Sequence, residues 1–366
     1  MDHIVENLIG SLLDAQHDYA EESIDSLKND RKEVYIFGAG AAGKLIKQDL
    51  DRFEIPVYRF VDNDVKKVGT RIEGVPVIGF QELVMAQKPK KIIIGTVAFH
   101  DEIVHQCLKS GIPSNELCLA DFLHYNRKEI TRNFFLNNIN AIVNIYQHCA
   151  DRESRELFIA NLVYQFTRDR RHYHGHLSEL EQQYYEPDII RLNNQEVYFD
   201  CGAKDGDTAL AFHRLQKGIY KKIVTFEPDQ ENYLLLQENL REFPRVENIN
   251  AGVGEREQIL AFHGNMGGHS SFGDAGELQA QIVPLDRYLE YQPTFIKMDI
   301  EGFELSALKG AQDILQQCRP KLAICVYHKP CDIVELPKYI LDQQEDYRVY
   351  FRLYRNFGHD LVCYCV

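Results

Sequence analysis

Two glycine-rich segments, one in each half of the chain, each follow a short apolar run and precede a helical pattern. The first segment is Gly38-Ala39-Gly40-Ala41-Ala42-Gly43, and the second lies within residues 200–208. A strand, a glycine turn and a helix in this order form the first βα unit of an open α/β sheet that binds a ligand at its strand end. Because the 366 residues also exceed the usual size of one core, we expect two α/β domains.

The alternation of apolar runs and helical patterns divides the chain into four parts. Residues 1–30 place apolar side chains at helical spacing and predict an N-terminal helical arm. Residues 31–122 alternate strands with helices and predict a Rossmann-like nucleotide-binding domain. Residues 123–190 lack strand runs and predict a helical connector, and residues 191–366 contain the second α/β series.

The end of the chain predicts how the second sheet closes. Apolar runs at residues 347–354 and 361–366 are separated only by a short loop. Two strands joined this tightly must be antiparallel, since a parallel return needs a crossover of a dozen or more residues. We therefore expect an α/β protein with two Rossmann-like domains, the C-terminal one a mixed sheet with one antiparallel strand, joined by the helical connector.

The charge of the chain narrows its partners and its location. The formal net charge is -14, and an acidic surface repels both nucleic-acid backbones and anionic membranes. No apolar run approaches the roughly 20 residues that span a bilayer, and the N-terminus is acidic where a signal peptide is basic. We expect a cytoplasmic protein that does not bind nucleic acid and has no membrane span, and a homodimer is a possible assembly.

The second glycine segment predicts a cofactor site. Glycine lets the backbone approach a ligand, and a helix N-terminus offers free N–H groups. Beside a carboxylate, such a loop suits a ligand that carries both a carboxylate and an ammonium group; a plain tight turn is the alternative. We assign cofactor binding to six residues of this segment: Asp200, Gly202, Ala203, Lys204, Gly206 and Thr208.

Glu227 ends the next apolar run, in the order Thr225-Phe226-Glu227-Pro228. It follows the glycine loop by about 20 residues, where Rossmann-type sites place a carboxylate that accepts both ribose hydroxyls. The alternative is an acidic helix start. We add Glu227, Pro228 and Gly252, which follows the next predicted strand, to the cofactor-binding set.

Two further strand ends carry polar side chains. On the strand that begins at Phe295, Lys297 and Asp299 share one face, and Asp299 emerges at the carboxyl end, where open α/β sheets bind ligands. His328 ends the next strand and could take a proton from an alcohol. We predict Asp299, His328 and Lys297 as catalytic residues, with Asp299 also touching the cofactor. Helix capping and a surface histidine are the alternatives.

At this point the segments VYFDCGAKDGDTALAF, VTFEP, FIKMDIEGFELSALKGA and LAICVYHKPCD resemble the FkbM-type methyltransferases, which use S-adenosylmethionine (SAM). The resemblance covers roughly residues 184–366. It implies O-methylation of sugar or polyketide hydroxyls, with SAM held by Asp200, Gly202, Gly206 and Glu227. It does not assign the base, and Lys204 stands where many members have a small polar residue.

The first glycine segment predicts a second ligand. Gly38, Gly40 and Gly43 are followed by Asp62 and Asn63 at the end of the next strand. Residues 61–79 resemble the front domain of bacterial sugar-modifying enzymes, which implies that this domain binds a nucleotide or nucleotide-sugar. An NAD site and a structural domain used for dimerisation are the alternatives.

Two functional hypotheses follow. The first is a SAM-dependent O-methyltransferase that acts on a hydroxyl of a sugar, nucleotide-sugar or related small molecule, so that its partner is a small-molecule or glycan acceptor. The second is a non-catalytic nucleotide- and SAM-binding regulatory protein. We expect no metal, although Asp299, Glu301 and His328 are side chains that could bind Mg²⁺ or Mn²⁺.

Overall fold

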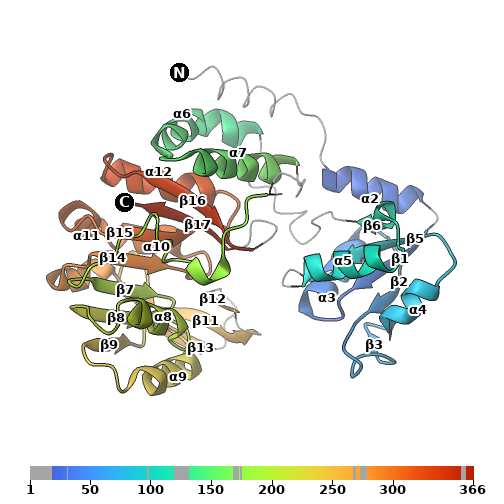
Figure 1. Ribbon diagram of the computed structural model, residues 1–366, viewed down its shortest axis with the longest axis horizontal. Coiled ribbons are helices and arrows are strands. Elements are labelled where there is room, and N and C mark those ends of the chain that lie inside the picture. The colour runs from blue at the N-terminus through green and yellow to red at the C-terminus, as the bar shows by residue number, and fades with distance from the viewer. Residues whose placement is uncertain are drawn as a thin grey trace. The chain divides into compact units, whose positions relative to one another are not determined.

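The structure is a computed structural model that describes residues 19–30, 32–96, 99–118, 132–167, 173, 175–266, 269–272, 278–355 and 360–366 (Figure 1). The described residues form two compact units. The first unit extends to Phe135 and includes Ala160–Gly175, and the second includes Leu136–Ile159 and His176–Tyr354. No helix within the described ranges is long and apolar enough to cross a membrane.

The first unit contains a six-stranded sheet in the order β3-β4-β2-β1-β5-β6, in which only the β3–β4 pair is antiparallel. Its strands are β1 (Glu33–Phe37), β2 (Val57–Val61), β3 (Arg71–Ile72), β4 (Val75–Ile78), β5 (Lys90–Ile94) and β6 (Leu117–Cys118). Its helices include α2 (Tyr19–Asn29), α3 (Ala41–Arg52), α4 (Phe80–Met85) and α5 (His100–Lys109).

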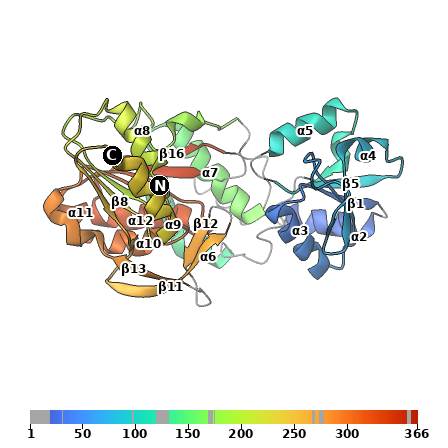
Figure 2. The same ribbon diagram turned by 90° about the horizontal axis from the view of Figure 1, so that it is seen from below.

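Strand β1 shows how the first sheet is buried on both faces. Val34 and Ile36 pack in one core cluster with side chains of α2 and α3, whereas Tyr35 and Phe37 pack in another with side chains of α4 and α5. Side chains alternate along a strand, so the two clusters cover opposite faces (Figure 2). Of the predicted N-terminal arm, α2 therefore packs on the sheet, and residues 1–18 lie outside the described residues.

The second unit contains a seven-stranded sheet in the order β16-β17-β15-β14-β7-β8-β9. Strand β17 is antiparallel to both of its neighbours, and the other pairs are parallel, which confirms the mixed sheet with one antiparallel strand. Its strands are β7 (Val197–Cys201), β8 (Lys222–Phe226), β9 (Val246–Ile249), β14 (Phe295–Met298), β15 (Lys321–Cys325), β16 (Val349–Leu353) and β17 (Leu361–Cys365).

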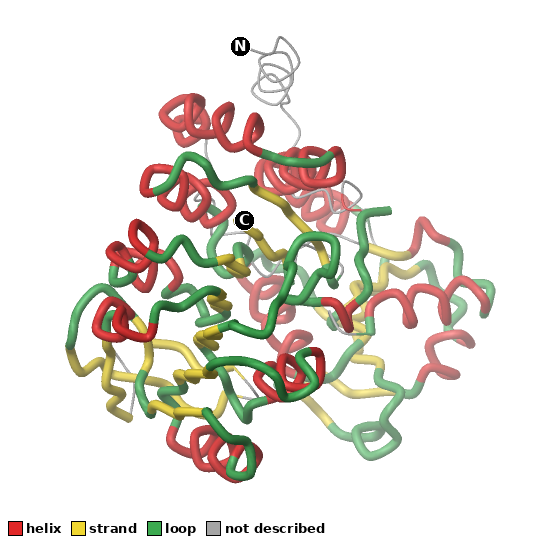
Figure 3. The backbone as a smooth tube through the Cα atoms, turned by 60° about the vertical axis from the view of Figure 1, so that its left-hand side comes forward, coloured by secondary structure: helices red, strands yellow, loops and turns green. Residues whose placement is uncertain are grey.

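Helices and loops cover this sheet (Figure 3). One core cluster joins the sheet to α8, α9 and the segment before β7; its members include Tyr184, Tyr198, Phe212, Leu236 and Phe295. The helices of this unit include α8 (Asp207–Leu215), α9 (Gln230–Leu240), α10 (Glu304–Lys309), α11 (Gln312–Gln317) and α12 (Asp332–Gln343). This packing brings the segment that precedes β7 against the strands that carry the predicted site.

The predicted connector contains helices α6 (Arg132–His148) and α7 (Arg152–Thr167). Asp151 lies between them and accepts a 2.6 Å hydrogen bond from Arg352 of β16. The rings of Phe158 and Phe351 stack with centroids 5.4 Å apart. Because of these contacts, residues Leu136–Ile159 belong to the second unit rather than lying between the units.

Two features depart from the predicted elements. A four-stranded sheet, in the order β10-β13-β11-β12, lies in the sequence between β9 and β14, where no strand was predicted. Its strands are β10 (Gly252–Val253), β11 (Gln258–Met266), β12 (His269–Phe272) and β13 (Leu278–Val283). The apolar spacing of residues 305–315 predicts one helix, but this segment forms two, α10 and α11, which separate near Gly310. A Cβ at Gly310 would lie 2.0 Å from Gly254 O, so the backbones meet there.

Candidate functional site

The loop after β7 needs glycine at two positions. Gly202 has a φ of 77°, and a Cβ there would lie 2.0 Å from the carbonyl oxygen of Asp299. The N–H groups of Gly202 and Ala203 both donate to Phe226 O, at 3.0 and 3.1 Å. Gly206 precedes α8 with a φ of 91°, a conformation that favours glycine. The loop is therefore held tightly against the ends of β8 and β14.

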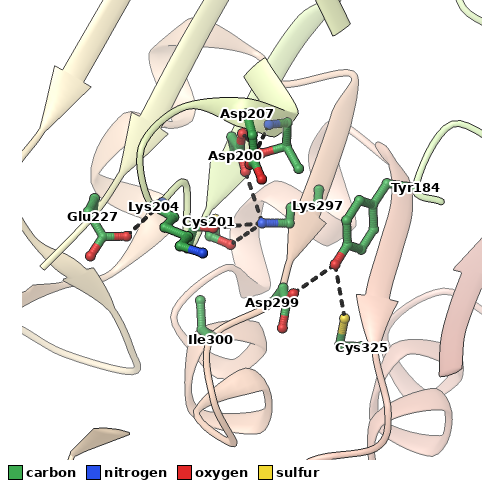
Figure 4. Close-up of polar contacts among 12 residues, drawn as sticks. Tyr184, Asp200, Cys201, Lys204, Asp207, Glu227, Lys297, Asp299, Ile300 and Cys325 are labelled. Carbon is green, nitrogen blue, oxygen red and sulfur yellow. Dashed lines mark hydrogen bonds and ion pairs between the residues drawn. The ribbon is translucent and has the colours of Figure 1, made fainter. Parts of the chain in front are cut away.

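A buried ion pair supports the loop from the sheet. Lys297 is 2% exposed; its Nζ lies 3.2 Å from Asp200 Oδ1 and donates to Gly202 O at 2.7 Å. Thr208 Oγ1 donates to Asp200 Oδ2 at 2.5 Å. Figure 4 shows Lys297 between Asp200 and the loop. Burial opposes the charge of Lys297, but Asp200 outweighs it and raises the pKa of the amine. Lys297 is thus a cation that anchors the loop rather than a proton acceptor.

Glu227 joins the end of β8 to the same loop. Its Oε2 accepts a 2.8 Å hydrogen bond from Lys204 N, and its Oε1 accepts one of 2.9 Å from Asp229 N. Lys204 has a φ of 49°, which turns its N–H toward the carboxylate. Burial raises the pKa of Glu227. Each carboxylate oxygen has a second lone pair, so Glu227 can also accept hydrogen bonds from a ligand diol.

Asp299 lies just past β14, with its side chain 25% exposed. Tyr184 donates a 2.7 Å hydrogen bond to Asp299 Oδ2 (Figure 4). Tyr327 donates one of 3.4 Å to Oδ1. His328 Nε2 lies 3.3 Å from the same Oδ1. Burial opposes ionisation, but contact with His328 and the charge of Lys297 hold the pKa of Asp299 below its usual range. Asp299 is an ionised carboxylate that can accept a hydrogen bond from a hydroxyl.

The histidine predicted as a base lies between carboxylates. His328 Nδ1 is 2.9 Å from Glu304 Oε1, and Nε2 is 3.7 Å from Glu301 Oε2 in addition to the contact with Asp299. Burial lowers the pKa of His328, but Glu304 and Asp299 outweigh it and raise the pKa well above the ordinary value. An imidazolium has no free lone pair, so this geometry does not favour the predicted role of His328 as a base.

The first unit places its glycine loop in an equivalent way. Gly38 has a φ of 120°, and a Cβ there would lie 2.6 Å from Gly95 O; a Cβ at Gly43 would lie 1.9 Å from Gly38 O. A Cβ at Gly40 would meet nothing within 4 Å. Asp62 Oδ2 accepts hydrogen bonds from Ala39 N at 2.8 Å and from Lys67 at 3.0 Å.

These residues line a cavity of about 520 Å³ in the first unit. Gly38, Gly40, Asp62 and Asn63 all belong to its lining, whereas Gly43 does not and packs the loop from behind. Asn63 and Gln106 exchange side-chain hydrogen bonds of 2.9 and 3.2 Å at its edge. The cavity brings four of the five predicted nucleotide-binding residues together.

The structure also separates some predicted residues and adds others. Asp200, predicted to bind the cofactor, is fully buried and paired with Lys297. Gly252, also predicted to bind the cofactor, begins β10 of the small sheet. Tyr184 was missed because it lies far before the motifs in a segment predicted to be helical. Glu304 was not among the predicted site residues, and its burial beside His328 has no local sequence signal.

Acidic and imidazole groups gather here without forming a metal cage. Within the described ranges, no group of three or more His, Cys, Asp or Glu side chains has an arrangement that could hold a metal ion. The contacts of His328 with Asp299, Glu301 and Glu304 are instead ion pairs.

The sheet order, the glycine loop and the acids at three strand ends are the features from which a methyltransferase domain was predicted for the second unit. Residues 200–352 match the family model described as the Methyltransferase FkbM domain. Residues 30–118 match the model described as C2185-like, N-terminal. No curated protein matches the chain.

One solved structure matches the chain over nearly its whole length. The crystal structure of an FkbM methyltransferase from Methylobacillus flagellatus is 24% identical, with 99% of each chain covered and a TM-score of 0.76. An rRNA methylase from Streptococcus thermophilus (15% identical, 51% of this chain and 89% of that chain) has a TM-score of 0.32. Fibrillarin from Aeropyrum pernix with bound SAM is 12% identical, with 50% of this chain and 73% of that chain covered, and has a TM-score of 0.31. The last two scores are too low to bear on this chain.

Proposed function

We propose that the protein is a SAM-dependent O-methyltransferase that acts on a hydroxyl of a sugar, nucleotide-sugar or related small molecule. The observation that carries the proposal is the hydrogen bond from Lys204 N to Glu227, which places a carboxylate at the end of β8 beside the glycine loop that follows β7. Asp299 follows β14, the strand on the other side of β7, so a ribose-binding acid and an acceptor-binding acid would flank the glycine loop.

The residues present fit SAM. Glu227 would accept hydrogen bonds from both ribose hydroxyls, and the glycines at 202 and 206 would let backbone N–H groups reach the methionine carboxylate. When bound, SAM supplies a methyl group on a sulfonium centre that is already activated for displacement. Asp200 and Lys297 would hold the loop in shape, since both are buried and paired with each other.

Asp299 would orient the acceptor in this reaction. Its ionised carboxylate accepts the hydrogen bond of the acceptor hydroxyl, and Tyr184 holds one of its oxygens in place. As the hydroxyl oxygen bonds to the methyl carbon, the bond from that carbon to sulfur breaks with its electron pair going to sulfur, and the hydroxyl proton passes to Asp299. A weak base suffices, because the hydroxyl becomes strongly acidic as the new C–O bond forms. Most of the acceleration then comes from positioning.

Calorimetry with SAM tests the cofactor claim. We expect the wild-type protein to bind SAM and Glu227→Ala to lose about 100-fold in affinity, the value of two charge-assisted hydrogen bonds. Glu238→Ala is the matched control, since Glu238 lies on the exposed side of α9 and pairs only with Arg241 in the described contacts. Absence of SAM binding, or equal affinity in the two variants, contradicts the proposal. Transfer of labelled methyl from SAM to a panel of sugar nucleotides and glycans tests the acceptor.

For the first unit we propose a nucleotide or nucleotide-sugar ligand. The support is the 520 Å³ cavity that Gly40, Asp62 and Asn63 line together. Calorimetry with nucleoside diphosphates, nucleoside diphosphate sugars and NAD tests it, and no heat with any of them contradicts it. If both ligands bind but no acceptor is methylated, the non-catalytic regulatory protein is favoured instead.

A further inference from the structure

His328 lies among charges from four elements. Asp299 and Glu301 face its Nε2 from the loop after β14, and Glu304 of α10 faces its Nδ1. Asp332 of α12 interacts with it electrostatically, the Tyr327 ring lies 4.2 Å from its own ring, and Lys329 follows it in sequence. The surrounding carboxylates outnumber the single lysine.

Glu304 is the most buried of these carboxylates, with no exposed surface. Its Oε1 accepts a 2.9 Å hydrogen bond from Ile300 N, which fixes it against the loop that also carries Asp299 and Glu301. The 2.9 Å approach to His328 Nδ1 is an ion pair by distance; among the described residues, neither ring nitrogen makes an aligned hydrogen bond. Charge rather than hydrogen-bond direction therefore holds the ring.

We propose that Glu304 is a positioning residue that keeps His328 as a cation, and that this cation holds the Asp299 and Glu301 carboxylates together at the acceptor end of the site. The role assigned to the acceptor end rests on the proposed function. Without the imidazolium, two carboxylates on either side of Nε2 would repel each other, since like charges this close disfavour joint ionisation. The raised pKa of His328 agrees with this geometry.

The three groups thus have separate tasks. Asp299 touches the acceptor, His328 acts through Asp299, and Glu304 acts through His328. Glu304 contacts neither Glu227 nor the loop after β7 in the described contacts, so its loss should spare the cofactor. Glu335 lies on the first turn of α12 and has no ion pair in the described contacts, so Glu335→Gln removes one negative charge without touching His328.

Histidine NMR of the full chain tests the proposal directly. The His328 ring signal is assigned by its loss in His328→Gln, and its titration is followed in the wild type, Glu304→Gln and Glu335→Gln. We expect the wild-type midpoint to lie above the ordinary value of about 6.5, and Glu304→Gln to lower it by about one pH unit or more. Glu335→Gln should leave it within about 0.3 unit. A wild-type midpoint at or below 6.5, or the same midpoint in Glu304→Gln, overturns the proposal.

If Glu304→Gln does not fold, Glu304→Asp replaces it, because that variant keeps the charge. It should then retain the raised midpoint; a midpoint near 6.5 overturns the proposal.

Two kinetic measurements follow once an acceptor is known. In Glu304→Gln, kcat should fall by about tenfold or more, as expected for lost positioning, while SAM affinity stays within about twofold. The NMR experiment needs neither SAM nor acceptor. Absence of SAM binding would therefore overturn the proposed function and leave the positioning role to be judged on the titration alone.

Discussion

The two glycine loops of the chain are built alike and equipped differently. In each, the first glycine donates its N–H to the last residue of the neighbouring strand, Gly38 to Val61 at 2.7 Å and Gly202 to Phe226 at 3.0 Å. In each, a backbone N–H of the loop donates a 2.8 Å hydrogen bond to an acid 23 residues further along the chain. The pairs are Ala39 with Asp62 and Lys204 with Glu227. It is for this shared geometry that we propose a ligand with a ribose in each unit.

The difference lies in what surrounds each loop. The second loop rests on the buried pair of Lys297 and Asp200, and the neighbouring strand ends in Asp299. The first loop has the half-exposed Lys67 beside its acid, and its neighbouring strand leads into Gly95. The comparison teaches that the two loops share a backbone and an acid at the next strand end, whereas only the second loop has buried charges beside it, on the strand for which we propose the chemistry.

The largest expected effect concerns the buried cation. Lys297→Met leaves Asp200 charged and unpaired in the core, so we expect a loss of about 3–5 kcal/mol in the free energy of unfolding of the second unit. Urea denaturation measures it. Lys67→Met in the first unit should cost less than about 1 kcal/mol, because that pair is open to solvent.

The double variant Lys297→Met/Asp200→Asn is the control, since it removes the unpaired charge and should recover much of the loss. Equal losses in Lys297→Met and Lys67→Met would show that the two loops are supported in the same way, and the comparison would fail.

The second expected effect is opposite pH dependence in the two units. Burial and then the charge of Glu304 raise the pKa of Asp332 to about 7. The folded protein therefore favours the neutral acid at this position, and the protein loses stability as the pH rises from about 4 to about 7. Asp332→Asn stays neutral. Relative to wild type, its free energy of unfolding should therefore rise by about 2 kcal/mol between pH 5 and pH 8.

Asp62 should behave in the reverse sense. Burial raises its pKa, but hydrogen bonds from Asp64 N and Ala39 N outweigh burial and lower it. Its stabilising contribution is present above the ordinary pKa and lost as pH falls. Asp62→Asn should accordingly be less stable than wild type at pH 7, with the difference shrinking toward pH 3, as followed by urea denaturation at each pH. The same sign in both variants would contradict the assignment.

The smallest effect on stability is expected at Gly40. A Cβ there meets nothing within 4 Å, so Gly40→Ala should change the free energy of unfolding by no more than about 0.5 kcal/mol. It should nevertheless lower nucleotide affinity by about tenfold or more in calorimetry, because the added methyl occupies the approach to the loop. Gly43→Ala is the contrast: its Cβ would overlap Gly38 O, and it should destabilise the unit. Unchanged nucleotide affinity in Gly40→Ala would remove this loop from the site.

Much of the fold followed from local patterns. The apolar runs at residues 347–354 and 361–366 were predicted as an antiparallel pair and form β16 and β17, because strands buried on both faces read as nearly continuous apolar runs. The sheet of β10 to β13 was missed: Ile259 in β11 is 68% exposed, and exposed apolar residues among polar ones give no clear alternation. Tyr184 was missed because it reaches Asp299 by packing against the sheet. No pattern in the segment before β7 indicates that packing.

The sequence by itself determined where the chain turns and which acids stand at strand ends. Glycine at 202, with its positive φ, and Glu227 after β8 are local features of short segments, and their spacing along the chain is enough to predict them. Only the tertiary structure decided the charge state of the side chains that meet there. Asp200 and Lys297 lie on different strands, and Glu304, His328 and Asp299 also lie on different elements. The pKa of each group depends on its burial and on distances of a few ångströms to the others. Sequence spacing does not contain those distances, which is why a histidine predicted as a base is held in the fold as a cation.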